Sequence, residues 1–197
     1  MTNPIQRNAS FQHILDTTEL LINEKGCRKT TLQDIIERSG LSKGAIYHYV
    51  SGKDELFGLV LKSKMEQMNN HFNDVVKNTP PKDAVLPIQF IAEGMAAQTE
   101  GQDISSKIMT YLLGRIDNPK VESILKEMYG FSLKTARSWI EIGQKAGAIP
   151  EGINAEKMAS LFMVFNYGLR VQNIIGKNTG QQVNVEDIFK FLLRSLQ

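Results

Sequence analysis

The chain has little of what marks a secreted or membrane-spanning protein. Cys27 is the only cysteine in 197 residues, so no intramolecular disulfide can form and a reducing, cytoplasmic setting is expected. The apolar runs, such as 161–165, are only a few residues long, whereas a membrane-spanning helix needs about 20. Residues 1–10 are polar and lack the apolar stretch of a secretory signal.

Signatures of catalysis and of metal binding are also missing. The sequence has no phosphate-binding glycine loop, no Gly-x-Ser-x-Gly turn and no His-Glu-x-x-His motif. Its three histidines, His13, His48 and His71, show no ligand spacing with Cys27 or with an acidic cluster. We therefore expect no metal and no cofactor, and an enzyme is the weaker hypothesis.

Helical periodicity is what the sequence has in abundance. Apolar residues recur at three- and four-residue spacing almost throughout, and no stretch alternates as a half-buried strand does. Gly26, the Thr79-Pro80-Pro81 break and several later glycines interrupt this pattern. We predict an all-α protein of about nine helices. They cover approximately residues 11–25, 31–39, 43–50, 54–77, 83–99, 103–115, 119–146, 154–176 and 184–196.

Residues 31–50 have the spacing of a helix-turn-helix, in which two short helices are joined by a tight turn. Thr31 and Asp34 fit an acidic variant of the capping box at the start of the first helix. Gly40 suits the left-handed turn between the helices, and Ser42 can cap the second helix. In this motif the second helix lies in the major groove of DNA.

The side chains of the second helix suit contact with DNA. Lys43, at its start, can reach phosphates or base acceptors. Gly44 and Ala45 are small enough to let the helix approach base edges, and Ala45 can touch a thymine methyl. Rigid rings with polar tips follow at Tyr47, His48 and Tyr49.

The local charge agrees with that interpretation. Residues 25–53 hold six lysines and arginines, against the two acidic residues Asp34 and Glu37. A local excess of positive charge is expected of a surface that binds phosphates. The alternative is that these side chains merely form a solvated basic face.

The stretches 30–36, 39–50 and 53–57 resemble the N-terminal domain of the TetR family of bacterial transcriptional repressors. The resemblance implies a DNA-binding domain over residues 1–55 and a ligand-binding and dimerisation domain over residues 56–197. Val50 stands where the family more often has phenylalanine, and Tyr49 where histidine is common. The positions expected to face DNA are Thr31, Ser42, Lys43, Gly44, Ala45, Tyr47, His48, Tyr49 and Lys53. Of these, Thr31, Tyr47 and Lys53 are expected to hold phosphates.

The middle helices are rich in methionine and aromatic residues, which suit an apolar pocket for a small effector. Polar side chains inside otherwise apolar helices could also contact such a ligand. The alternative stays open that these side chains form the core or make helix–helix hydrogen bonds. The candidates are Phe90, Met95, Met109, Tyr111, Tyr129, Trp139, Asn166 and Arg170.

The last two predicted helices, 154–176 and 184–196, are too apolar to be satisfied within one small domain. Pairing is also expected because a single short helix reads only a few base pairs. In the TetR family the corresponding helices form a four-helix bundle with those of a second copy. The expected interface residues are Met158, Leu161, Phe162, Phe165, Leu169, Ile188, Phe189 and Leu192.

The sequence thus predicts a repressor that binds a palindromic operator as a homodimer and is released by a small-molecule effector. Its expected partners are double-stranded operator DNA, the effector and a second copy of the chain. One alternative is a helical protein-interaction module without sequence-specific DNA binding, and another is an enzyme that binds a small molecule. The salt dependence of binding separates the repressor from the protein-interaction module. The logarithm of a DNA-binding constant falls linearly with the logarithm of salt concentration, whereas binding through an apolar interface barely changes.

Overall fold

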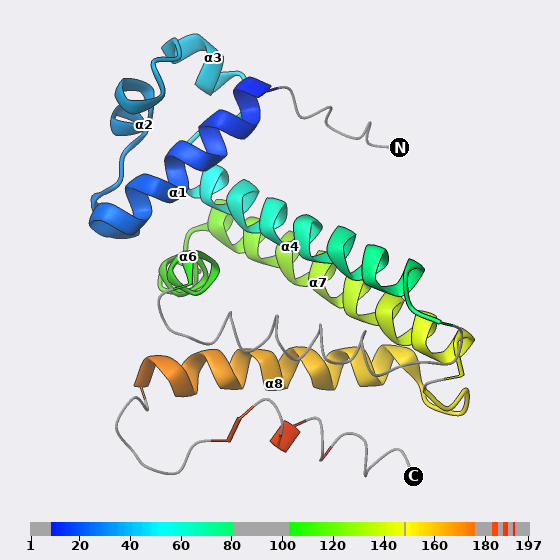
Figure 1. Ribbon diagram of the computed structural model, residues 1–197. Helices are drawn as coiled ribbons and strands as arrows, with labels where there is room; N and C mark the ends of the chain where they lie inside the picture. Colours follow the sequence, from blue (N-terminus) through cyan, green and yellow to red (C-terminus); the bar gives the residue numbers. More distant parts are fainter. Residues whose placement is uncertain are drawn as a thin grey trace. The chain divides into compact units, whose positions relative to one another are not determined.

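The computed structural model describes residues 9–80, 103–147, 149–175, 183–184, 187–188 and 191. These residues form seven helices and no strand (Figure 1). The helices are α1 (Ala9–Lys29), α2 (Leu32–Ser39), α3 (Lys43–Tyr47), α4 (Lys53–Lys77), α6 (Ile104–Leu113), α7 (Pro119–Lys145) and α8 (Ala155–Ile175). The all-helical prediction is confirmed for this part of the chain.

The described residues hold seven helices where the sequence analysis expected about nine. The two helices not matched are the predicted ones at 83–99 and 184–196. The first lies entirely outside the described residues, and the second lies mostly outside them. Within the described ranges, no helix is long and apolar enough to cross a membrane.

The chain divides into two compact units. The first consists of Met1–Ser63 and Lys107–Lys126, and the second of Lys64–Ser106 and Glu127–Gln197. The helices α4, α6 and α7 each carry residues of both units. Residues 107–126 therefore belong to the same compact unit as the helix-turn-helix segment.

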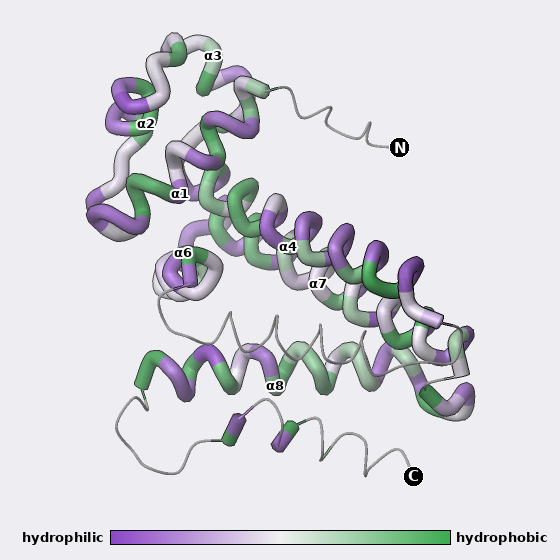
Figure 2. Tube along the Cα trace, in the orientation of Figure 1, coloured by the Kyte–Doolittle hydropathy of each residue, from purple (hydrophilic) through white to green (hydrophobic). Residues whose placement is uncertain are grey.

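Every helix of the first unit contributes to its core. Hydrophobic and hydrophilic residues alternate along α1, as Figure 2 shows. This spacing lets one side of the helix be buried while the other side faces water. The removal of this apolar surface from water is the main stabilising contribution. The apolar side chains of this unit that are 0% exposed are Ile14, Leu15, Ile22, Ile35, Ile46, Leu56, Phe57, Val60, Ile108, Leu112 and Val121.

Gly26 interrupts α1, as the sequence predicted. Its φ of 79° and ψ of 159° are not helical, and a short helical segment then continues to Lys29. The Gly26 carbonyl accepts hydrogen bonds from the backbone N–H and the hydroxyl of Thr30, at 3.2 and 3.0 Å. The positive φ suits glycine, because a Cβ strains this conformation.

In the second unit, aromatic packing joins α4 to α7. The rings of Phe72 and Trp139 lie 4.8 Å apart, and the Trp139 indole donates a hydrogen bond of 2.9 Å to the side-chain carbonyl of Asn69. Trp139 is only 6% exposed. A further cluster joins α7 to α8 through Ala136, Ile140 and Ala159.

Gly58 allows α4 and α7 to approach closely inside the first unit. A Cβ built at Gly58 would lie 2.6 Å from Cγ2 of Ile124, a branched methyl close to its own backbone. We expect Gly58→Ala to lower the free energy of unfolding by about 1–3 kcal/mol through overpacking. Gly130 on α7 has no atom within 4 Å of the corresponding position. Gly130→Ala is therefore the control and should be neutral or stabilising by up to ~1 kcal/mol. Equal stability of the two variants in denaturant unfolding would contradict the close approach.

Candidate nucleic-acid interface

The two helices of the helix-turn-helix are fixed by local hydrogen bonds. The Asp34 N–H donates to Oγ1 of Thr31 at 3.2 Å, and the Thr31 N–H donates to Oδ2 of Asp34 at 2.8 Å, which completes the predicted capping box. Gly40 has a left-handed φ of 68° and ends α2. Ser42 caps α3, because its Oγ accepts the Ala45 N–H at 3.2 Å.

Buried and exposed side chains separate clearly along α3 and its flanks. Ile46 and Val50 are 0% and 3% exposed, and they anchor the segment in the core of the first unit. Tyr47 is 47% exposed, and Ala45 and Tyr49 are half-buried. The exposed predicted residues of this segment are Ser42, Lys43, Gly44, Tyr47 and His48. The structure thus brings the predicted residues 42–49 together on one short element.

The aromatic residues of this segment have different environments. The Lys43 ammonium lies 5.6 Å from the centroid of the exposed Tyr47 ring, a cation–π contact. The Tyr49 ring packs against Phe11 of α1 at 4.9 Å and against His48 at 5.2 Å. Tyr49 therefore also helps to attach the end of α3 to α1.

Gly44 is not required by the fold. A Cβ at this position would approach only Oγ of Ser42, at 4.0 Å, and the φ is not in the left-handed region. A helical glycine costs about 1 kcal/mol of helix stability relative to alanine. Nothing in the described part of the chain therefore requires a glycine at this position.

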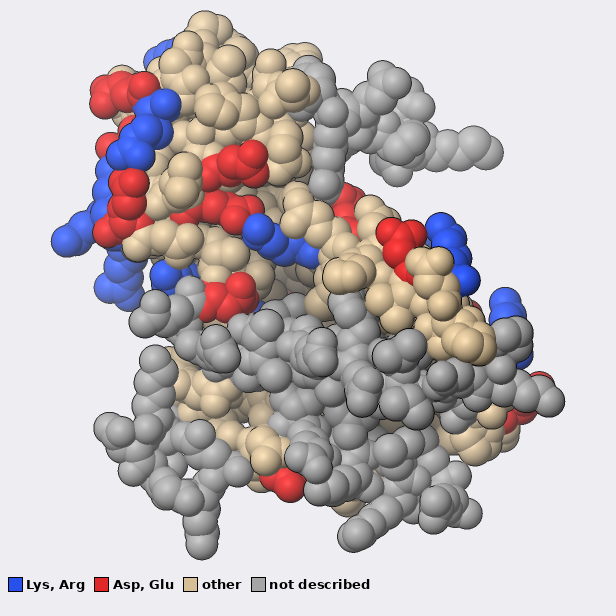
Figure 3. Space-filling view, in the orientation of Figure 1, with Lys and Arg blue, Asp and Glu red and all other residues tan. Residues whose placement is uncertain are grey.

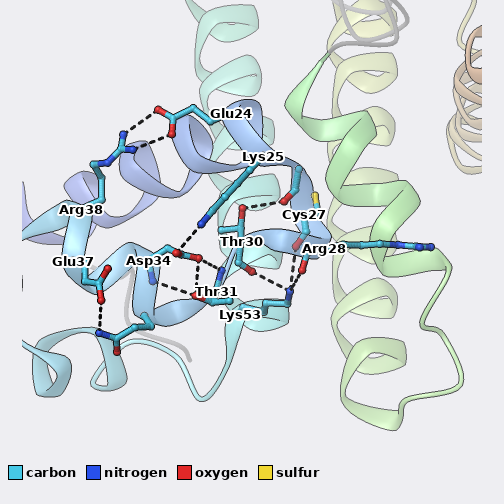
Figure 4. Close-up of polar contacts among 12 residues, drawn as sticks. Glu24, Lys25, Cys27, Arg28, Thr30, Thr31, Asp34, Glu37, Arg38 and Lys53 are labelled. Carbon is cyan, nitrogen blue, oxygen red and sulfur yellow. Dashed lines mark hydrogen bonds and ion pairs between the residues drawn. The ribbon is translucent and has the colours of Figure 1, made fainter.

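Acidic partners neutralise part of the predicted positive surface. Lys25 pairs with Asp34 at 2.6 Å, and the Arg38 guanidinium donates two hydrogen bonds to Glu24, at 3.0 and 2.9 Å (Figure 4). Glu24 lies one residue before the segment whose charge was counted. Figure 3 shows the resulting mixture of basic and acidic side chains on one face. In the described part of the chain, no ion pair joins a carboxylate to Arg28, Lys29, Lys43 or Lys53, and the Lys53 ammonium is bound by backbone carbonyls instead.

Lys53 has a well-defined role inside the first unit. Its Nζ donates hydrogen bonds to the carbonyl oxygens of Cys27, Arg28 and Thr30, at 3.1, 3.1 and 3.0 Å (Figure 4). These carbonyls follow the interruption of α1, where helix-end carbonyls lack partners within the helix. Burial lowers the pKa of Lys53. This network was missed from the sequence, since nothing local links Lys53 to residues 27–30, and its phosphate contact stays a prediction.

The predicted effector-binding residues do not form one group. Phe90 and Met95 lie outside the described residues, and Met109 and Tyr111 belong to the first unit. Trp139 lies in the core of the second unit.

Tyr129, Asn166 and Arg170 also belong to the second unit. Tyr129 is 42% exposed. Its ring stacks on that of Tyr167, with the two centroids 6.4 Å apart. Arg170 donates hydrogen bonds to Oδ1 of Asn166 at 3.0 Å and to Oγ of Ser106 at 3.3 Å, and burial lowers its pKa. The first of these bonds lies within α8, and the second joins α8 to α6, which is the hydrogen bond between helices that the sequence left open as an alternative. Among the described residues, no group of three His, Cys, Asp or Glu side chains could hold a metal ion.

The predicted dimer residues fall into distinct environments. Leu161 is 47% exposed, whereas Leu169 and Ile188 are 4% and 3% exposed and pack within their own subunit. Phe189 and Leu192 lie outside the residues whose side chains are described. The remaining three, Met158, Phe162 and Phe165, are half-buried.

An exposed stripe on α8 was only partly predicted. Val164, Val171 and Ile175 are 65%, 53% and 78% exposed. Together with Leu161 and the exposed Gly168 they alternate at three and four residues, the seven-residue spacing of helices that pair along one seam. We call these five residues the α8 stripe. The seven-residue spacing is the signal in the sequence that could have found them.

Asp34 gives the helix-turn-helix a testable dependence on pH. Hydrogen bonds from Lys25 and then from Thr31 lower the pKa of Asp34 to about 2. Because the carboxylate form is the one bound in the folded protein, its stabilisation is present above the ordinary carboxyl pKa. It is lost as the pH falls through about 2.

We expect Asp34→Ala to lower the free energy of unfolding by ~1 kcal/mol at neutral pH, through loss of the hydrogen bond from the Thr31 N–H and of the ion pair with Lys25. The difference from the unchanged protein should shrink below pH 4. Glu37→Ala, which removes only the hydrogen bond from Gln33 on the same helix, is the control and should have a smaller effect. Denaturant unfolding between pH 2 and pH 7 measures both. A deficit for Asp34→Ala that does not change with pH would contradict this role.

Comparisons with known proteins agree with this geometry. A family model described as "Bacterial regulatory proteins, tetR family" matches residues 14–60. An uncharacterized HTH-type transcriptional regulator of Bacillus subtilis, YvdT, is 29% identical over 98% of both chains. A probable acrEF/envCD operon repressor of Escherichia coli K12 is 24% identical over 74% of this chain and 67% of its own length.

Solved structures with the same fold cover nearly the whole chain. Salmonella enterica GusR has 20% identity and a TM-score of 0.66, over 100% of this chain and 98% of its own. FadR of Bacillus subtilis, solved in complex with stearoyl-CoA, has 18% identity and a TM-score of 0.59, over 94% and 97%. At these low identities the solved structures establish only the shared fold. The family-model match at residues 14–60 covers the helix-turn-helix. Residues 14–60 thus carry the helix-turn-helix domain of the tetR family of bacterial regulatory proteins, and the chain as a whole is similar to HTH-type transcriptional regulators.

Proposed function

We propose that the chain is a cytoplasmic, ligand-responsive repressor that binds a palindromic operator as a homodimer and is released by a small-molecule effector. The exposed Gly44 carries the DNA-binding part of this proposal. No neighbour among the described residues requires a glycine there, yet it lies on α3, the short helix that a helix-turn-helix inserts into the major groove. Lys43 and Tyr47 flank it, and both are exposed.

The proposed roles follow from exposure. Lys43, Gly44, Ala45 and His48 read base edges, and Tyr47 and Thr31 hold phosphates. Arg28 and Lys29 add positive charge where no carboxylate pairs with them among the described residues. Because two of the six cations counted from sequence are paired with acidic side chains, the phosphate-binding surface is narrower than the composition suggests.

The effector part of the proposal rests on the second unit. FadR of Bacillus subtilis, which has the same fold, was solved with stearoyl-CoA, so this fold can hold a small-molecule ligand. Within the second unit, Tyr129, Asn166 and Arg170 are the predicted effector contacts that are not simply core residues. Arg170 is the strongest of them, because its guanidinium carries five N–H donors, of which those that bind Asn166 and Ser106 are only a part, so it can also bind an acceptor on a ligand.

Selection of duplexes from a randomised pool at moderate salt tests the DNA-binding proposal directly. The selected duplex should bind more weakly as salt rises, linearly on a log–log scale, as phosphate counterions return.

Gly44→Ala should lower affinity for that duplex about tenfold, the cost of one disturbed base contact. It should leave stability unchanged or raised by up to ~1 kcal/mol. Gly130→Ala, at another helical glycine with no described atom within 4 Å but in the second unit, is the matched control and should leave affinity unchanged. If the protein prefers no duplex, or if its affinity does not change with salt concentration, the alternative of a protein-interaction module is favoured over a repressor.

The α8 stripe is the proposed contact with the second copy. Val164→Glu places a carboxylate in the proposed seam, at a side chain that is 65% exposed in its own subunit. An unpaired buried charge should weaken the dimer about a hundredfold or more. Ile116→Glu, at a residue 51% exposed in the first unit, is the control and should leave the dimer intact. Sedimentation velocity at micromolar concentration measures the oligomeric state of both variants. A dimeric Val164→Glu variant would exclude the stripe as the interface.

A further inference from the structure

Four side chains of the first unit form a compact cluster that includes none of the residues of α3. Lys53 and Asp54 are the first two residues of α4, Tyr111 lies near the end of α6, and Arg115 follows α6. We call this set the α4 clamp. All four lie in the same compact unit as the helix-turn-helix.

Asp54 is held by two groups from the α6 region. The Tyr111 hydroxyl donates to Oδ1 of Asp54 at 2.9 Å, and the Arg115 guanidinium contacts Oδ2 at 3.2 Å. The Asp54 side chain is 20% exposed, so this ion pair is partly shielded from water. Arg115 also lies 5.4 Å from the centroid of the Tyr111 ring. Burial and then the hydrogen bond to Asp54 raise the pKa of Tyr111 to about 12, so the hydroxyl keeps its proton.

Lys53, the neighbour of Asp54, extends the cluster to the helix-turn-helix. Its ammonium lies 5.3 Å from the centroid of the Tyr111 ring and binds the carbonyls of Cys27, Arg28 and Thr30. The last of these carbonyls immediately precedes Thr31, the N-cap of α2. An unbroken series of contacts therefore runs from the end of α6, through the first turn of α4, to the start of α2.

We propose that Tyr111 and Arg115 are positioning residues for DNA binding, which fix the start of α4 and, through Lys53, the turn that precedes α2. The inference rests on the proposed function, and it gives a role to two residues that the helix-turn-helix motif does not include. Neither side chain needs to touch DNA. Their contribution is to the angle at which α2 and α3 are presented, which affects base contacts more than attraction to phosphates.

The test compares two arginines whose loss removes the same charge. Arg115→Ala breaks the clamp, whereas Arg137→Ala breaks an exposed ion pair with Glu141 on α7, whose two atoms lie 2.7 Å apart. Affinity for the selected operator and for a random duplex is measured by fluorescence anisotropy at one salt concentration. Arg115→Ala should weaken operator binding about 3- to 30-fold, the range of couplings between residues remote from a ligand. It should change binding to the random duplex no more than Arg137→Ala does.

Three further variants separate positioning from simple stability. Arg115→Lys keeps the charge beside Asp54 and should restore most of the operator affinity. Tyr111→Phe keeps the ring and removes only the hydroxyl, so it should fold and still weaken operator binding. Lys53→Met combined with Arg115→Ala should cost less than the product of the two single effects, because both act through one cluster.

The outcomes are distinguishable. If the unchanged protein selects no duplex, the proposed function fails and the inference fails with it. If it selects an operator but Arg115→Ala and Tyr111→Phe bind that operator as Arg137→Ala does, only the inference fails. Equal losses for operator and random DNA would also overturn it, since they would indicate a phosphate contact.

Discussion

The arrangement of the first unit depends on one ammonium group bound by three carbonyls. α1 ends close to the start of α2, and the chain between them has carbonyls that no helix can satisfy. Lys53 supplies the donors for Cys27, Arg28 and Thr30 from the first turn of α4. Burial of an ammonium is unfavourable, which its lowered pKa reflects, and the three hydrogen bonds offset that cost. The start of α2 is thereby tied to α4.

Local signals in the sequence predicted the helix-turn-helix well. The partners in the capping box are three residues apart, and Gly40 and Ser42 act on the helices they adjoin, so spacing alone was enough. The ion pair of Arg38 with Glu24 joins residues 14 positions apart, and the contacts of Lys53 span 23 to 26 positions. Only the folded chain brings these groups together. For the same reason, the charge counted along the sequence exceeded the charge left unpaired on the surface.

For the second unit, composition predicted that α8 is apolar but not which of its side chains are buried and which are exposed. The apolar character of α8 agrees with the exposed apolar side chains on this helix, and their burial against a second copy stays a prediction. Which side is covered depends on how the helix packs, and Leu169 faces inward whereas Val164 and Val171 face outward. Trp139 shows the same limit. An aromatic ring at helical spacing suits a pocket or a core equally, and its contacts with Phe72 and Asn69 place it in the core.

The interruption of α1 at Gly26 has a consequence for how this sequence can vary. The positive φ of Gly26 turns the chain so that the carbonyls of residues 27, 28 and 30 converge on a single point. A residue with a Cβ at position 26 would favour another backbone path, and the carbonyls would then diverge. A lysine at position 53 has these three partners only while that path is kept. Glycine at 26 and lysine at 53 are therefore expected to be retained together or replaced together among related chains.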